Sequence, residues 1–221
     1  MRRYVISAPR SGLNWLRYCV EHHYGVRTPG RQEKLYVPDA GPGAFIRSHD
    51  PLWAGVKRNN AQYRRIDPEQ TAGGLVLLIL RDPLETFVRM AERKFSAFAA
   101  YPSNIRFFTE AVAARKAIYY YEDLIVDPSK MAEAMAFLDI APAPGRPIPT
   151  LASITNEWEL LAERSRASYD DATGGGAMTK SRPHDFKFHQ RSLWWWQKSR
   201  VWHYLERSLS SEEMRHLDRY R

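Results

Sequence analysis

The sequence predicts an α/β fold in which a central parallel sheet is covered by helices on both faces. Strand-like segments alternate with helical segments over residues 1–140, which is the pattern of such folds. Residues 74–80, with the sequence GLVLLIL, form a continuous apolar run of strand length. Parallel strands that are buried on both faces have this composition. We therefore expect residues 74–80 to lie at the centre of the sheet.

The chain begins with a strand, a tight turn and a helix start in quick succession. Residues 4–8 are rich in β-forming side chains, Pro9 and Gly12 mark the turn, and Ser11 can cap the helix that follows. Such a helix start presents free backbone N–H groups and the positive end of the helix dipole, which together attract an anion. The turn, PRSGLNW at residues 9–15, lacks the GxxxxGK[ST] pattern, which disfavours an ordinary nucleoside-triphosphate loop.

Three predicted strands carry polar side chains at their carboxyl ends. Arg10 follows the first strand, His49 follows a strand expected over residues 44–48, and Arg81 follows residues 74–80. Ligands of parallel α/β folds bind outside the carboxyl ends of the strands. These three side chains are therefore expected to share one site.

The later elements are mostly helical. Asp82 and Asp127 are each followed by proline, a combination typical of an N-cap and a first helical residue. Ser210 and Glu213 have the spacing of a capping box. The expected elements after residue 80 are helices beginning near Asp82 and around residues 95–108, a strand over residues 117–121, and helices after Asp127, over residues 153–165 and over residues 191–221.

Composition favours one domain with an anionic partner. The 221 residues, 44% of them hydrophobic, can bury one substantial core, and the net charge of +8 favours binding of an anion. The single cysteine, Cys19, excludes an internal disulfide framework and a cysteine-based zinc site, and is expected to be a buried thiol. Trp194, Trp195 and Trp196 are expected to pack against the sheet.

The N-terminus enters the first strand after three residues, which leaves no room for a signal peptide, and no apolar run reaches the length of a membrane span. We therefore expect a cytoplasmic protein without a membrane span.

Four segments, taken in their order along the chain, resemble the sulfotransferases that use 3′-phosphoadenosine 5′-phosphosulfate (PAPS). PRSGLNW at residues 9–15 is similar to the 5′-phosphosulfate loop of that family, and RSH at residues 47–49 is similar to its Lys-Thr-His segment, which bears the catalytic base. Residues 75–89 resemble its 3′-phosphate strand and helix, and YED at residues 121–123 resembles a strand end whose tyrosine lies near the adenosine. The resemblance covers residues 4–140.

The resemblance implies a three-layer α/β/α fold of the P-loop nucleoside-kinase type, with residues 1–140 as a nucleotide-binding core and residues 141–221 as a helical, acceptor-side segment of the same domain. It implies PAPS as the sulfuryl donor, 3′,5′-adenosine bisphosphate (PAP) as the product, no metal, and a hydroxyl or amine of a small molecule or carbohydrate as the acceptor. His49 would be the base, and Arg10 would stabilise the leaving phosphate. The implied nucleotide-binding residues are Arg10, Ser11, Gly12, Leu13, Asn14, Trp15, Arg81, Arg89 and Tyr121.

The chain departs from the family pattern at several positions. Arg10 replaces a lysine, Leu13 and Asn14 replace the usual threonine or serine pair, and Arg89 stands where a serine contacts the 3′-phosphate. The C-terminal loop that closes over the nucleotide is not evident. The basic residues that could take its place are Lys180, Arg182 and Lys187.

Two other classes of function stay open. A phosphotransferase or nucleotide-kinase-like enzyme could use the same anion cradle, although the missing lysine of the triphosphate loop and the presence of His49 disfavour it. A basic module that binds a nucleotide or nucleic acid without catalysis would also fit the charge, although a nucleic-acid partner is not expected.

Overall fold

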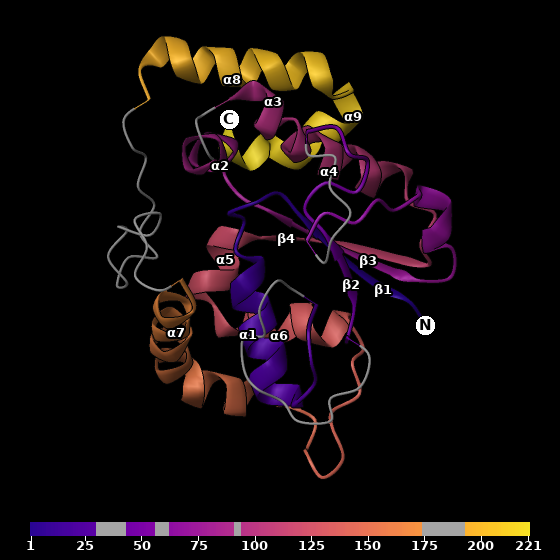
Figure 1. The fold of residues 1–221 in the computed structure, drawn as a ribbon, viewed down its shortest axis with the longest axis vertical. Coiled ribbons are helices and arrows are strands. Elements are labelled where there is room, and N and C mark those ends of the chain that lie inside the picture. Colours follow the sequence, from indigo (N-terminus) through magenta and orange to yellow (C-terminus); the bar gives the residue numbers. More distant parts are fainter. Residues whose placement is uncertain (30–42, 56–61, 91–93, 174–192) are drawn as a thin grey trace.

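The computed structural model describes residues 1–29, 43–55, 62–90, 94–173 and 193–221, with the side chains of residues 166–173 excepted. Within these residues, four parallel strands form one sheet in the order β2-β1-β3-β4. The strands are β1 (Arg3–Ser7), β2 (Ile46–Ser48), β3 (Leu75–Leu80) and β4 (Arg115–Tyr120). Helices lie on both sides of the sheet (Figure 1). The predicted α/β class with a parallel sheet is confirmed.

The apolar run forms β3, and all six of its residues are buried. It lies between β1 and β4, as expected, and pairs with β1 in a register that places Leu77 beside Val5. Since helices cover both faces of the sheet, a strand in its middle has no face left for water, which is why its sequence does not alternate.

Side chains of β1 and β3 alternate between two apolar cores. Val5, Leu77 and Ile79 belong to one core. The helices that pack on this core are α1 (Leu13–Tyr24), α5 (Tyr121–Val126), α6 (Pro128–Phe137) and α7 (Leu151–Thr173). Cys19, in α1, is fully buried in it, as predicted. In Figure 1 these helices lie below the sheet.

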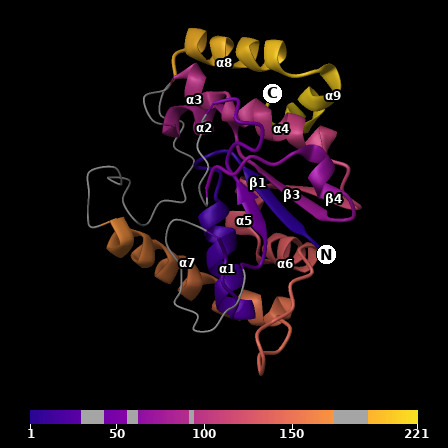
Figure 2. The ribbon, with the colours of Figure 1, turned by 45° about the vertical axis from the view of Figure 1, so that its right-hand side comes forward.

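Ile6 and Leu78 point into the other core, on the opposite face of the sheet. The elements that pack there are α2 (Pro83–Arg89), α3 (Phe95–Phe98), α4 (Ala100–Glu110), α8 (Trp195–Ser208), α9 (Ser211–Met214) and the 3-10 helix η4 (Arg215–Tyr220). A short 3-10 helix, η1 (Pro68–Thr71), precedes β3. Figure 2 shows the same division of the helices from another side.

The strand order places the switch point of the fold, where a ligand crevice is expected, between β1 and β3. The connection from β1 through α1 leads to β2 on one side, whereas the connection from β3 through α2, α3 and α4 leads to β4 on the other. Adjacent strands whose connections leave in opposite directions mark the point where parallel α/β folds bind ligands, at the carboxyl ends. Residues 8–12, after β1, and residues 81–82, after β3, meet at this point.

Several expected boundaries are corrected by the structure. The strand expected over residues 117–121 ends at Tyr120, and Tyr121 begins α5. The helix expected over residues 153–165 is longer at both ends, and the helical region expected over residues 191–221 divides into α8, α9 and η4. The capping box at Ser210 is confirmed, because its Oγ accepts from the N–H of Glu213 at 3.2 Å.

The tryptophan run does not pack against the sheet, so that expectation is wrong. Trp194, Trp195 and Trp196 are 69%, 79% and 44% exposed. They form the N-cap and first residues of α8, whereas the buried positions of this helix, Val201 and Leu205, lie further along. Among the described residues, no helix is both long enough and apolar enough to cross a membrane.

The start of α2 follows the predicted capping pattern. Pro83 is its first residue, and Asp82 Oδ1 accepts from the N–H of Leu84 at 2.7 Å and of Glu85 at 3.2 Å. These bonds satisfy two of the backbone donors that every helix leaves free at its first turn.

Replacing Asp82 with Ala should lower the free energy of unfolding by about 1 kcal/mol, because it removes both capping bonds. Urea unfolding of the variant measures this loss. Asp218→Ala, at an exposed position in η4, is the control and should change stability by less than about 0.5 kcal/mol. Equal stability of the Asp82 variant and the wild type would show that the cap is unimportant.

Candidate functional site

The turn after β1 has an unusual backbone and leaves several donors without partners among the described residues. Arg10 and Gly12 both adopt positive φ angles, 70° and 84°. Gly12, not Ser11, is the N-cap of α1, and no side chain caps this helix, so the predicted capping role of Ser11 is wrong. Its hydroxyl is instead buried one residue before the cap, and Ser11 Oγ has no hydrogen-bond partner among the described residues.

Backbone donors at the start of α1 are also available. Within the described residues, no acceptor contacts the N–H groups of Gly12, Leu13 and Asn14, whereas the N–H of Trp15 donates to Gly12 O at 2.9 Å. The side chains of Leu13 and Trp15 are buried in the core. Of these two residues, Leu13 can therefore contribute to an anion site only through its backbone N–H, and Trp15 has a structural role in packing.

The loop is held in place by Arg81 and Tyr121. A Cβ atom at Gly12 would lie 2.2 Å from Cδ2 of Tyr121, so the ring occupies the space that any other residue would need. The Arg81 guanidinium lies 4.2 Å from the centroid of the same ring, and its Nη1 donates to Arg10 O at 2.8 Å. Arg81 and Tyr121 thus contact the loop itself, while Arg81 Nε stays buried without a partner among the described residues.

The His49 ring is held in one neutral tautomer. Its Nδ1 donates to Ser7 O at 2.8 Å, and because a carbonyl can only accept, the lone pair must be on Nε2. Burial of the ring, together with the charges of Arg47, Arg17 and Arg10, lowers the pKa of His49 to about 3. The imidazole is therefore neutral at pH 7.

Arg47 is a buried cation with spare hydrogen-bond donors. Its Nη2 donates to His49 Nε2 at 3.3 Å, but its Nε and Nη1 have no partner among the described residues. Burial and the nearby charge of Arg17 lower the pKa of Arg47 to about 9, which leaves it protonated at pH 7. A buried charge with unused donors is costly unless an opposite charge reaches it. Arg47 therefore indicates an anion site next to His49.

Arg17 also belongs to the candidate site, although the sequence did not predict it. It is fully buried in α1, and its Nη1 donates to Asn14 Oδ1 at 3.3 Å. Its Nε donates to Thr28 Oγ1 at 2.9 Å, and Glu21 lies 3.6 Å away. Because Asn14 Oδ1 accepts the bond from Arg17, the NH₂ group of the Asn14 amide is the part of this side chain that could donate to a ligand. The spacing of residues 14, 17 and 21 on one helix face was the available signal.

Arg81 and Arg89 are brought together by a buried carboxylate. Glu85 Oε2 lies 3.5 Å from Arg81 Nη2 and 3.1 Å from Arg89 Nε. Glu85 and Arg89 lie one turn apart in α2, and Arg81 precedes the N-cap of this helix. Glu85 Oε1 has no partner within the described part of the chain. Both arginines are predicted site residues, whereas the glutamate that they share is not.

The predicted residues thus gather at the carboxyl edge of β1, β2 and β3, and Tyr121 follows β4. Their roles in binding stay predictions. Arg10 is exposed at this edge. Lys180, Arg182 and Lys187 lie outside the described residues.

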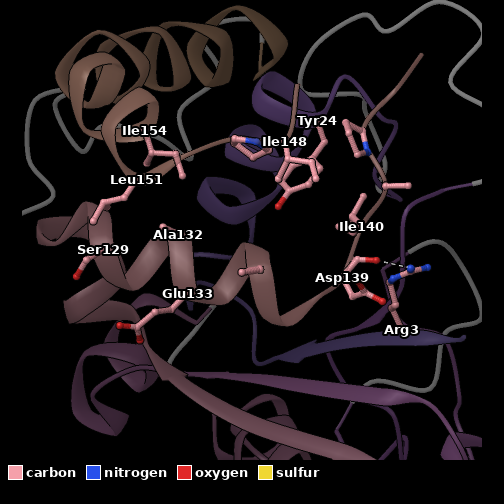
Figure 3. Close-up of a pocket in the computed structure, with 14 residues that line it drawn as sticks. Arg3, Tyr24, Ser129, Ala132, Glu133, Asp139, Ile140, Ile148, Leu151 and Ile154 are labelled. Carbon is pink, nitrogen blue, oxygen red and sulfur yellow. Dashed lines mark hydrogen bonds between the residues drawn. The ribbon is translucent and has the colours of Figure 1, made fainter. Parts of the chain in front are cut away.

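A cavity of about 830 Å³ lies elsewhere, at the amino end of the sheet (Figure 3). Its lining includes Arg3 at the start of β1, Tyr24 at the end of α1, and apolar side chains such as Ile148, Leu151 and Ile154. None of the predicted site residues lines it. The cavity is therefore separate from the crevice where the donors gather.

Replacing His49 with Gln should weaken the loss of stability in acid. The folded protein keeps His49 neutral down to about pH 3, whereas the unfolded chain protonates it near its ordinary pKa of 6.5. Between these values the unfolded state binds the extra proton, so the free energy of unfolding falls as the pH decreases. The variant should lose less stability than the wild type between about pH 7 and about pH 4.5 in urea unfolding.

His203→Gln, at an exposed position in α8, should keep the wild-type difference between the two pH values. If His49→Gln also keeps it, the ring does not resist protonation in the folded protein.

Comparison with models of known protein families gave no match, and comparison with curated proteins found no similar sequence.

Proposed function

We propose that the protein is a PAPS-dependent sulfotransferase with a P-loop nucleoside-kinase-like fold, which transfers a sulfuryl group to a hydroxyl or amine of a small molecule or carbohydrate. One observation carries the proposal most strongly. A neutral histidine with its lone pair on Nε2 lies beside a buried arginine that has two unused donor nitrogens. This combination suits a reaction that removes a proton from an acceptor next to a tetrahedral anion.

The anion would be held by charge and by backbone donors together. Arg47 supplies buried N–H groups, Ser11 supplies a buried hydroxyl, and Gly12 to Asn14 supply backbone N–H groups at the positive end of α1. PAPS, when bound, supplies the sulfuryl group. Its leaving group is a phosphate, which does not need to be protonated. Arg10 fits that phosphate as a cation with several N–H donors.

The proton of the acceptor would pass to His49 Nε2. As the acceptor oxygen or nitrogen bonds to sulfur, the sulfur–oxygen bond to the phosphate breaks, and the proton stays on the imidazole. Ser7 O then faces a ring that has become cationic, and its bond to Nδ1–H becomes stronger. Arg47 Nη2 occupies Nε2 in this structure, so it must release that nitrogen when the acceptor enters.

Arg89 is the candidate for the 3′-phosphate. The Arg89 side chain is a quarter exposed and pairs with Glu85, which also pairs with Arg81. A phosphate would compete with Glu85 for Arg89, and Glu85 would still have Arg81 as a partner. Arginine can pair with phosphate through two parallel hydrogen bonds, which serine cannot do. The replacement of the usual serine by Arg89 is therefore compatible with this role.

PAP should bind the protein at least about tenfold more tightly than AMP or ATP. Isothermal titration calorimetry with the three nucleotides measures this preference. Arg89→Ala should weaken PAP binding and leave AMP binding unchanged, since AMP has no 3′-phosphate. A preference for ATP would instead favour a phosphotransferase, and the absence of PAP binding would refute the proposal.

His49→Ala should reduce turnover by about 10²- to 10⁴-fold while PAP affinity changes little. Turnover is measured by incubating PAPS with a panel of hydroxyl and amine acceptors and detecting, by mass spectrometry, the product that gains one sulfuryl group. His203→Ala is the control and should retain full activity. Unchanged turnover in His49→Ala would exclude this residue as the base, and PAP binding with no product from any acceptor would favour a binding module.

A further inference from the structure

A second group of convergent polar side chains lies at the opposite end of α1 from the turn at residues 9–15. His22 and His23 belong to the last turn of α1, and Glu157 belongs to α7, which packs beside it. The two helices lie next to each other in Figures 1 and 2. One ligand atom from each of the three side chains lies within 4.8 Å of the other two.

His23 is the most buried of the three side chains. It is 5% exposed, and its Nε2 is buried without a hydrogen-bond partner within the described residues. Burying an imidazole without a partner costs free energy, because its nitrogens lose their hydrogen bonds to water. Nδ1 faces Glu157 Oε2 at 3.8 Å, too far for a hydrogen bond. This nitrogen is placed to bind something that lies between the two groups.

We propose that His22, His23 and Glu157 bind a Zn²⁺ ion. Two imidazole nitrogens and one carboxylate oxygen are ligands that zinc prefers. Bonds of about 2.0–2.1 Å in a tetrahedron place neighbouring ligand atoms about 3.3 Å apart. The distances from Glu157 Oε2 to His22 Nε2, 2.9 Å, and to His23 Nδ1, 3.8 Å, lie on either side of that value.

The surroundings are compatible with a cation. The carboxyl end of a helix carries partial negative charge, and both histidines lie in the last turn of α1. Arg146 is the opposing charge, but its Nη1 is bound to His22 O at 2.6 Å. His22 and Glu157 are partly exposed, which leaves access for the ion and for water as a fourth ligand.

The ion would join the end of α1 to α7. This site is separate from the crevice at the other end of α1, so it supplies no step of the proposed sulfuryl transfer. The two proposals can therefore fail independently.

Untagged, metal-free, full-length protein should bind one Zn²⁺ per chain in a saturable calorimetric titration. Co²⁺, used as a spectroscopic probe, should give the visible absorption of a tetrahedral nitrogen and oxygen site. Zn²⁺ should also raise the thermal unfolding midpoint, because it binds the folded state. His22→Ala and Glu157→Gln should each weaken Zn²⁺ binding by at least about tenfold and reduce the rise in the midpoint.

Glu157→Gln keeps the size of the side chain, so its loss of binding would not reflect misfolding if the metal-free midpoint is unchanged. His203→Ala removes an exposed histidine of α8 outside the group and should bind Zn²⁺ like the wild type. Absence of saturable binding, or equal binding by all variants, would overturn the proposal.

Discussion

The candidate site depends on the contacts of the buried Arg81 guanidinium. It joins the end of β3 to the loop after β1 through Arg10 O, to the ring of Tyr121 and to Glu85. Removing it would leave the carboxylate of Glu85 buried with fewer partners and the ring without its cation, and such losses are costly. The loop with positive φ angles at Arg10 and Gly12 is thus contacted by two other segments of the chain, which bring Arg81 and Tyr121 against it.

The candidate site carries an excess of buried positive charge. Arg17, Arg47 and Arg81 are all buried, and burial lowers the pKa of each. Among the described residues, the buried carboxylates of Glu21 and Glu85 pair with Arg17 and Arg81. Burial of the ring, together with the positive charges of the nearby arginines, keeps His49 neutral. An incoming anion would stabilise the arginines and offset their charge, which would raise the pKa of His49 toward the range in which it can accept a proton.

The helix α1 connects both proposals through its polarity. Its amino end carries free N–H groups at Gly12 to Asn14, where an anion is favoured, and its carboxyl end carries His22 and His23, where a cation is favoured. Arg17 and Glu21 lie between these ends as a buried pair, and Thr28 donates its N–H to Glu21. One helix can therefore present opposite preferences at its two ends without any change in its regular backbone.

The sequence by itself determined the elements whose signals are local. The apolar run of β3, the cap and proline that start α2, and the strand-end positions of Arg10, His49 and Arg81 follow from short-range pattern. The tertiary structure decided what those side chains meet. Ser7 O sets the tautomer of His49, Tyr121 occupies the space beside Gly12, and Glu157 reaches two histidines from another helix. Each of these contacts joins residues more than about 30 positions apart, so burial and charge at the site depend on packing that no local pattern encodes.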